Sequence, residues 1–369
     1  MENILLFISC FVLSVILGII VVRNVLYVSF TLNLFDLPGE RKIHKGTIPR
    51  LGGFSFFPII TFVFCLAIGG LFLCNRNDSI GLQKENLKEA VFFMAGCIPL
   101  YLVGLKDDLV GENYRYKFAV QIITAIILLA GGSWLYFWGG ILGIEQVPNF
   151  VGIPFTVFLI VYITNAINLI DGIDGLASGL CVVSLVVFVV LNVLVGDLFH
   201  ALIAAIGIGV ILPFWYYNMF GRVEEKNKLF MGDTGSLTLG FILSYLLIYS
   251  CQDSELQSME SRFPYLFVAL SSLLVPMLDV VRVVLIRLLK GRNPFLSDKN
   301  HFHHKMFRLG LSSRGVMLFI ITISVVFIIL NASLIYRDVN INLIILADIL
   351  LWITMHFLLS KRIRVLEKK

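Results

Sequence analysis

Charged residues are scarce in this sequence. Asp, Glu, Lys and Arg make up 14% of the 369 residues, whereas a soluble globular domain has about 25%. Internal repeats and low-complexity tracts are absent too, and the longest polar stretch is 287–315. These absences exclude an ordinary soluble domain and leave no natural point of division. We therefore expect residues 1–369 to form a single transmembrane domain.

Several common motifs of enzyme chemistry are also missing. The six cysteines, at positions 10, 65, 74, 97, 181 and 251, have no CxxC spacing, so neither a disulfide framework nor a cysteine zinc site is indicated. HExxH does not occur, and neither does a GxxxxGK segment followed by Ser or Thr. A zinc-protease helix and a P-loop are thereby excluded, and any phosphate must be bound in another way.

Long apolar runs dominate the sequence instead. Hydrophobic residues make up 58% of the chain and include 31 Phe. A membrane core about 30 Å thick needs roughly 20 apolar residues in each helix that crosses it. The runs lie near 4–28, 51–73, 90–105, 118–138, 153–165, 177–195, 199–217, 235–251, 263–286, 316–336 and 341–360. They predict an all-α, polytopic integral membrane protein with about eleven transmembrane helices.

Lys and Arg are unevenly distributed between the gaps that separate these runs. Placing the N-terminus outside puts 22 of the 29 Lys and Arg in the inside gaps and 5 in the outside gaps. The positive-inside rule then predicts an external N-terminus, a cytoplasmic C-terminus and a retained first helix. The net charge of +5 comes from these loops and suits lipid headgroups or phosphorylated ligands better than nucleic acid.

Nearly all residues capable of chemistry fall in the inside gaps. We expect one active site on the cytoplasmic face, formed by the loops near 36–53, 104–117, 165–176, 218–236 and 287–315. The first loop holds Lys45, three further cations and a Pro-containing turn. A simple positive-inside anchor is the alternative interpretation of that loop.

Asp107 and Asp108 are adjacent at the end of the third run. Two neighbouring carboxylates at a lipid interface are costly unless a cation lies near them. A bound Mg2+ or a substrate proton would supply the reason for the pair. The alternative is a solvated pair of acids beside Arg115 and Lys117.

Polar residues recur at every third position in the next inside gap. Asn165, Asn168, Asp171 and Asp174 follow this spacing in a segment without Lys or Arg, which places them along one face at a helix end. Two amides and two carboxylates are typical of a hard-oxygen site for a divalent cation. Helix capping is the alternative.

The last two inside gaps hold an aspartate and a histidine cluster. Asp233, in the segment MGDTGS, lies where the eighth run begins, and taken alone it is best explained as a helix cap. His301, His303 and His304 lie among cations, where imidazoles suit a diphosphate. Carboxylates and phosphate-seeking cations together indicate phosphoryl transfer between a lipid phosphate and a nucleotide-linked group.

Five sequence blocks carry a resemblance to a known family. RKIHKGTIPRLGG, GLKDD, NAINLIDGIDGLASG, FMGDTGS and HFHH occur in this order. The sequence resembles the polyprenyl-phosphate N-acetylhexosamine-1-phosphate transferases over residues 36–315. The first block and HFHH are similar to the bacterial undecaprenyl-phosphate N-acetylglucosamine-1-phosphate transferases, whereas the peptidoglycan branch usually has three consecutive His.

The resemblance implies a multi-pass enzyme of the bacterial inner membrane that depends on Mg2+, with Mn2+ as an alternative metal. Its substrates would be a UDP-N-acetylhexosamine and a polyprenyl phosphate, and UMP would be released. Asp107 or Asp108 would deprotonate or orient the lipid phosphate, and Asn168 with Asp233 would hold the metal. The substrate-binding residues implied are Lys45, Lys117, Asn165, Asp171, Asp174, Asn218, His301, His303 and His304.

Some features leave alternatives open. The resemblance implies that Asn218 contacts the uracil. Residues 222–228 look like an insertion between Asn218 and Asp233, which weakens this assignment. Phospho-MurNAc-pentapeptide transfer in peptidoglycan synthesis is one alternative function, and a transporter with interfacial acids is another. Asp279 and Arg282 lie inside an apolar run at i,i+3 spacing, where they could simply pair. A homodimer also stays open.

Overall fold

The computed structural model describes residues 2–35, 48–132, 134–250, 262–293 and 301–367. Each predicted apolar run holds one long α-helix, and the short α10 is an addition that the sequence did not predict. The helices are α1 (Glu2–Thr31), α2 (Phe56–Leu73), α3 (Lys84–Val110), α4 (Tyr114–Leu129), α5 (Asn149–Ile170), α6 (Leu176–Val195), α7 (Leu198–Phe220), α8 (Gly232–Ser250), α9 (Arg262–Leu289), α10 (Phe302–Arg308), α11 (Ser313–Tyr336) and α12 (Ile341–Leu366). Two 3-10 helices, η1 (Leu51–Ser55) and η2 (Asn77–Ile80), and a hairpin of β1 (Phe137–Ile141) and β2 (Ile144–Gln146) complete the described fold. The protein is a helical, multi-pass membrane protein, as predicted.

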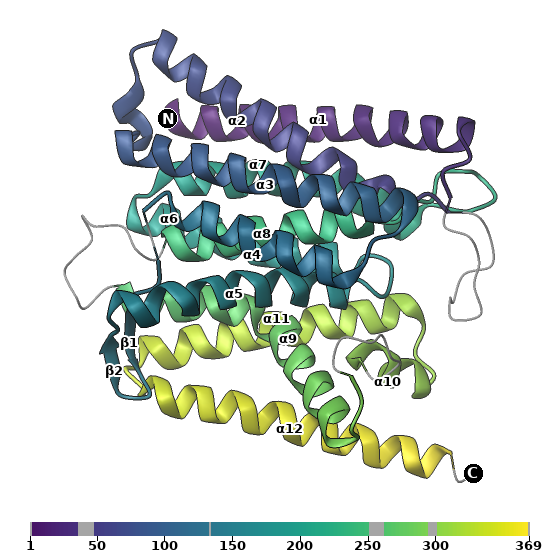
Figure 1. The fold of residues 1–369 in the computed structure, drawn as a ribbon. Helices are drawn as coiled ribbons and strands as arrows, with labels where there is room; N and C mark the ends of the chain where they lie inside the picture. The colour runs from purple at the N-terminus through teal and green to yellow at the C-terminus, as the bar shows by residue number, and fades with distance from the viewer. Residues whose placement is uncertain (1, 36–47, 133, 251–261, 294–300, 368–369) are drawn as a thin grey trace.

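Nine helical segments of the described residues are long and apolar enough to cross a membrane, and α4 and α8 are not among them. α8 lies in the middle of the bundle, packed against α3 and α5 (Figure 1). All residues from 234 to 249 are buried, so the hydroxyls of this helix meet protein rather than lipid. A helix enclosed by other helices needs no lipid-compatible surface. The exact number of crossings and their orientation stay predictions.

The predicted run 118–138 is not one helix. α4 ends at Leu129, and Gly132 takes φ +113, a conformation that favours glycine. The chain then forms the β1–β2 hairpin, whose turn has φ +55 at Leu142 and +76 at Gly143, as in a type I′ turn. The consecutive glycines 131 and 132 were the sequence signal for this break.

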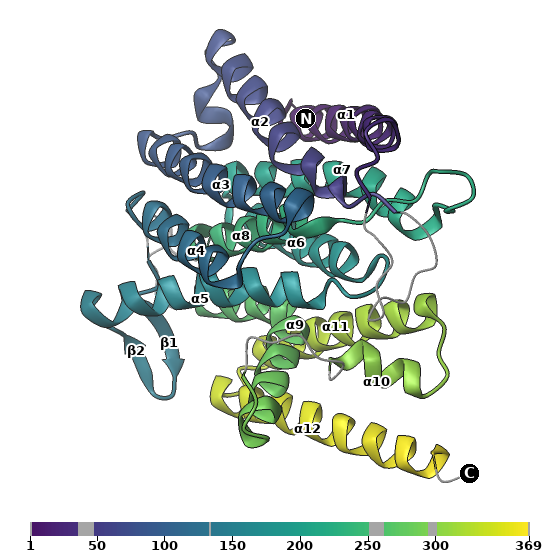
Figure 2. The ribbon, with the colours of Figure 1, turned by 45° about the vertical axis from the view of Figure 1, so that its right-hand side comes forward.

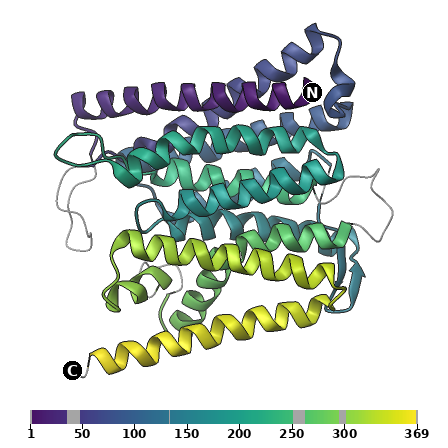
Figure 3. The same ribbon diagram turned by 180° about the vertical axis from the view of Figure 1, so that it is seen from behind.

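α9 departs from the common direction of the bundle. It contains Pro276, and proline inside a helix removes a backbone hydrogen bond and causes a kink. The labelled part of α9 runs steeply toward α12 in Figures 1 and 2. Seen from behind, α11 and α12 form the lower part of the molecule (Figure 3). The short α10 packs against both of them.

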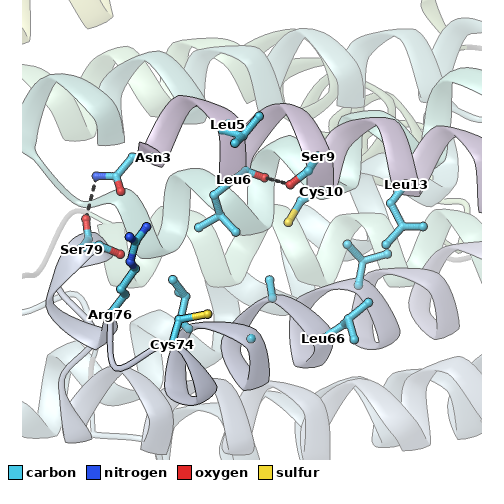
Figure 4. A pocket seen from close by; sticks show the side chains of 14 residues that line it. Asn3, Leu5, Leu6, Ser9, Cys10, Leu13, Leu66, Cys74, Arg76 and Ser79 are labelled. Carbon is cyan, nitrogen blue, oxygen red and sulfur yellow. Dashed lines mark hydrogen bonds between the residues drawn. The ribbon is translucent and has the colours of Figure 1, made fainter. Parts of the chain in front are cut away.

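A cavity of about 500 Å³ lies between the first half of α1 and the second half of α2. Leu6, Leu13 and Leu66 are among the apolar side chains that line it (Figure 4). Nδ2 of Asn3 donates a hydrogen bond to the carbonyl of Ser79 at 2.7 Å. The cavity lies near the start of α1, whereas the predicted site loops follow the ends of α1, α3, α5 and α7 (Figure 1). It is therefore not the site predicted from the motifs.

Candidate active site

Three carboxylates meet at one end of the bundle. Asp107 and Asp108 lie in the last turn of α3, and Asp233 lies in the first turn of α8. One oxygen atom from each carboxylate lies within 4.8 Å of the other two. Two acidic motifs more than one hundred residues apart in the sequence thus form a single cluster.

Asp108 caps α8 from the neighbouring helix. Its Oδ1 accepts a hydrogen bond from the backbone N–H of Asp233 at 2.7 Å. Its Oδ2 accepts from the N–H and the hydroxyl of Thr234, at 2.9 and 2.6 Å. A carboxylate is stabilised there because the N–H groups and the dipole of the helix N-terminus favour negative charge. The cap of α8 is therefore Asp108 and not Asp233, whose Oδ2 lies 2.7 Å from Nζ of Lys117 instead.

Asp107 has a different environment. Its Oδ1 accepts from the backbone N–H of Glu112 at 2.8 Å and lies 3.2 Å from Nζ of Lys117. The same Nζ lies 2.7 Å from Oδ2 of Asp233. The side chains of Asp107, Lys117 and Asp233 are 15%, 20% and 25% exposed. This part of the cluster is consequently accessible to a ligand.

Glycines allow three motif blocks to pack in direct contact. A Cβ at Gly53 would overlap the backbone of Gly235, and a Cβ at Gly104 would lie 2.6 Å from the Cα of Thr234. The N–H groups of Gly52 and Gly53 also donate to the carbonyls of residues 230 and 231, at 2.9 and 2.8 Å. The glycines of these blocks are required for the loops to approach the start of α8.

Gly53→Ala is expected to destabilise the protein. The added methyl group would force the η1 segment away from Gly235, and such overpacking costs about 1–3 kcal/mol. Gly69→Ala is the matched control, because a Cβ there meets nothing within 4 Å. Thermal unfolding in detergent should show a lower midpoint for Gly53→Ala alone. Equal midpoints for the two variants would contradict this packing argument.

The end of α5 contacts the start of α8. Nδ2 of Asn168 donates to Oγ of Ser236 at 2.8 Å, which leaves Oδ1 of Asn168 as an acceptor near the start of α8, the helix that carries Asp233. The amide of Asn165 instead bonds to the side chain of Gln121 and to the carbonyl of Val161. Asn168 is therefore suited to a ligand, whereas Asn165 ties α5 to α4.

Asp171 and Asp174 lie beyond the end of α5, in the turn before α6. Burial, and next the carboxylates of Asp233 and Asp174, raise the pKa of Asp171 to about 8. Asp174 pairs with Nζ of Lys228 at 2.5 Å. Asp171 thus belongs electrostatically to the acidic cluster, while the charge of Asp174 is balanced by a lysine.

Asn218 holds two segments of backbone together. Its Oδ1 accepts from the N–H of Gly175 at 2.6 Å, and its Nδ2 donates to the carbonyl of Leu229 at 2.8 Å. Asn218 is only 6% exposed. Because both ends of the amide are occupied by backbone groups, we leave Asn218 out of the proposed contacts to uracil.

The three histidines lie at the start of α10, and His303 packs onto the 171–174 turn. The rings of His301 and His303 are nearly parallel, with centroids 5.9 Å apart, and those of His303 and His304 are 4.2 Å apart. A Cβ at Gly172 would lie 2.5 Å from Cε1 and Nε2 of His303. Burial, and next His304 and His301, lower the pKa of His303 to about 3, so its imidazole is neutral at physiological pH.

The remaining comparisons between sequence and structure concern single residues. Lys45 lies outside the described residues. Lys228 was overlooked because it falls in the segment interpreted as an insertion. The sequence also did not predict that Thr234 and Ser236, the two hydroxyl residues that flank Gly235 in MGDTGS, bond to Asp108 and Asn168. Nothing in the sequence pairs Lys228 with Asp174.

These features define a class of protein. A multi-pass helical membrane protein presents, at the ends of its helices, clustered carboxylates, a lysine that contacts two of them and a histidine cluster. Such a site can bind phosphate groups and a divalent cation beside the lipid phase.

Comparison with known proteins agrees with this class. Residues 90–251 match the family described as Glycosyl transferase family 4. A Bacillus subtilis (strain 168) protein named "Probable undecaprenyl-phosphate N-acetylglucosaminyl 1-phosphate transferase" is 29% identical over 88% of this chain and 84% of its own length. Proteins of Yersinia pestis and Escherichia coli (strain K12), both named undecaprenyl-phosphate alpha-N-acetylglucosaminyl 1-phosphate transferase, are each 30% identical. The alignments cover 79% and 78% of this chain and 74% and 72% of those relatives.

The chain belongs to glycosyl transferase family 4. The family and the branch predicted from the five sequence blocks are thereby confirmed.

Proposed function

We propose that this protein transfers N-acetylglucosamine 1-phosphate from UDP-N-acetylglucosamine to undecaprenyl phosphate and releases UMP. The reaction takes place at the cytoplasmic face of the bacterial inner membrane, as the first membrane step of a cell-envelope glycan. The observation that carries the proposal is the cluster of Asp107, Asp108 and Asp233 with Lys117 at the ends of membrane helices. The names of the bacterial relatives support the choice of substrates.

A divalent cation, Mg2+ or alternatively Mn2+, fits this cluster. Three carboxylates converge within 4.8 Å, and the single ammonium group of Lys117 balances only part of their charge. Mg2+ prefers oxygen ligands of this kind. Asp233 and Oδ1 of Asn168 would hold the ion, and Asp107 would lie beside it. When bound, the metal neutralises charge on the diphosphate and on the transferred phosphoryl group.

The lipid phosphate attacks the sugar-bearing phosphorus of the UDP-sugar directly, because it is already ionised near neutral pH. A new P–O bond joins the two phosphates of the lipid product. The bond from that phosphorus to the bridging oxygen of UDP breaks, and UMP leaves with the electron pair.

The residues around the cluster have separate tasks in this reaction. Asp107 orients the lipid phosphate and accepts its remaining proton, while Asp108 keeps the start of α8 in place. Lys117 offsets phosphate charge within reach of both Asp107 and Asp233. Asp171 and Asp174 border the nucleotide. The histidine cluster, whose His303 packs on their turn, contacts the diphosphate or the sugar.

Release of labelled UMP by the purified protein in detergent tests this function. We expect release that needs undecaprenyl phosphate, Mg2+ and UDP-N-acetylglucosamine together. A parallel reaction with UDP-MurNAc-pentapeptide tests the peptidoglycan alternative, and further UDP-sugars test other hexosamines. Release only with another UDP-sugar would keep the reaction and change the substrate. Absence of release with every UDP-sugar, from folded protein, would favour the transporter.

A further inference from the structure

Asp279 is a fully buried carboxylate in α9 that the proposed chemistry does not use. Three donors surround it. Oδ1 accepts from Nη2 of Arg282 at 2.9 Å and from the backbone N–H of Phe302 at 3.1 Å. Oδ2 lies 2.9 Å from Nδ1 of His301. A buried charge is tolerated only when it is paired and hydrogen-bonded in this way.

Two of these donors belong to the segment that carries the histidine cluster. His301 and Phe302 form the start of α10, so Asp279 fixes this start against α9. The sequence predicted only a simple pair between Asp279 and Arg282. The contact to His301, 22 residues further along the chain, gives the aspartate a connection to the site.

The geometry also determines where the proton of His301 lies. An ionised carboxylate only accepts hydrogen bonds, so Nδ1 of His301 must be the N–H donor. When the ring carries one proton, its lone pair is therefore on Nε2. Carboxylates that bond one nitrogen of a histidine fix its tautomer and ring direction in many active sites.

Ring contacts link the orientation of His301 to that of His303. The His301 ring lies parallel to that of His303, with an angle of 8° between the planes. His303 in turn contacts Gly172. This glycine follows Asp171, whose carboxylate interacts with that of Asp233 in the acidic cluster. A continuous set of contacts therefore joins Asp279 to the site.

We propose that Asp279 is a positioning residue that keeps the proton of His301 on Nδ1 and thereby presents Nε2 of that ring to the substrate. The contact between His301 and substrate rests on the proposed function. The Asp279–His301 pair itself rests on the geometry alone.

Asp279→Asn changes the tautomer of His301 while keeping the shape of the side chain at position 279. Arg282 and the Phe302 N–H are donors, so the amide oxygen of Asn must face them, and its NH2 group must face His301. Nδ1 would then have to accept, and the proton would move to Nε2. Loss of a carboxylate that orients a histidine lowers activity about 10- to 100-fold, and we expect a loss of that size in kcat.

Histidine-selective 15N NMR measures the tautomer directly, and His301→Gln identifies the resonance. We expect the Nδ1–H form in the wild-type protein and the Nε2–H form in Asp279→Asn. The Nε2–H form in the wild type would overturn the proposal. This measurement on the wild-type protein does not require the Asp279 variant to fold. The NMR test also remains valid if the protein releases no UMP. Failure of UMP release would count against the proposed function instead.

Kinetics supply the second test. If Asp279 acts through His301, the double variant Asp279→Asn/His301→Gln should lose no more kcat than His301→Gln alone, within about twofold. Asp348→Asn is the matched control, since Asp348 is also buried but bonds to Asn331 at 2.9 Å, away from the histidines. It should leave kcat unchanged. Additive losses in the double variant, or full kcat in folded Asp279→Asn, would overturn the proposal.

Discussion

Asp107→Asn is expected to lower kcat for UMP release about 10³-fold, the scale of a lost general base, without lowering the thermal unfolding midpoint. The fold uses the Asp107 side chain for one backbone contact, from the N–H of Glu112, and an Asn oxygen can still accept that bond. What the variant loses is the negative charge beside Lys117 and the ability to take a proton. Activity should therefore fall while stability is kept.

Asp108→Asn should behave differently, although the two residues are adjacent. Three donors converge on the two oxygens of Asp108, and an NH2 group in place of one oxygen would face a donor. A buried unsatisfied donor costs about 1–3 kcal/mol, so both stability and activity should fall.

Glu112→Gln is the control for both variants. Glu112 pairs with Lys106, and their side chains are 13% and 57% exposed, so this partly exposed pair contributes about 1 kcal/mol or less. UMP release and thermal unfolding should be measured on the same preparations. A lower midpoint with retained kcat in Asp107→Asn would reverse the proposed roles of the two aspartates.

The sequence predicted the helices well because apolar length is a local property. Each predicted run contains a helix, and the errors fall where glycine or packing overrides hydropathy. The run 118–138 ended early at its glycine pair, and the enclosed α8 has a weaker apolar signal than the helices that face lipid. α10 is only 7 residues long, too short for a periodic pattern.

The site was predictable at the level of loops but not of partners. Motifs at the same side of a membrane have to lie near one another, so the convergence of Asp107 and Asp233 could be expected. The pairing of Asp108 with the α8 N-terminus, of Lys228 with Asp174 and of Asp279 with His301 depends on how helices are packed. Sequence spacing contains no information on such long-range side-chain contacts.

Removal of divalent metal should lower UMP release as strongly as Asp107→Asn does. Chelation with EDTA is expected to lower UMP release by at least about 10³-fold, equivalent to several kcal/mol of charge stabilisation at the reacting phosphate. Added Mg2+ should restore activity. Full activity in excess EDTA would exclude the metal role assigned to Asp233 and Asn168.

The amount of Mg2+ required should depend on pH. The pKa of Asp171 is raised to about 8 by burial and by nearby carboxylates, so in the metal-free protein this carboxyl holds a proton below pH 8. A bound cation favours the ionised form, so metal and proton compete. As pH falls from 8 to 6, the Mg2+ concentration for half-maximal activity should rise, by up to about tenfold per pH unit for one displaced proton.

Asp171→Asn tests the origin of this pH dependence. The variant cannot take up the proton, so the Mg2+ requirement should vary less with pH, even if kcat is lower. Asp338→Asn is the control, because Asp338 is exposed and its φ of +54 is well tolerated by Asn. Titrations of UMP release with Mg2+ at several pH values give the slope for each protein. An unchanged slope in Asp171→Asn would show that the competing proton resides on another group.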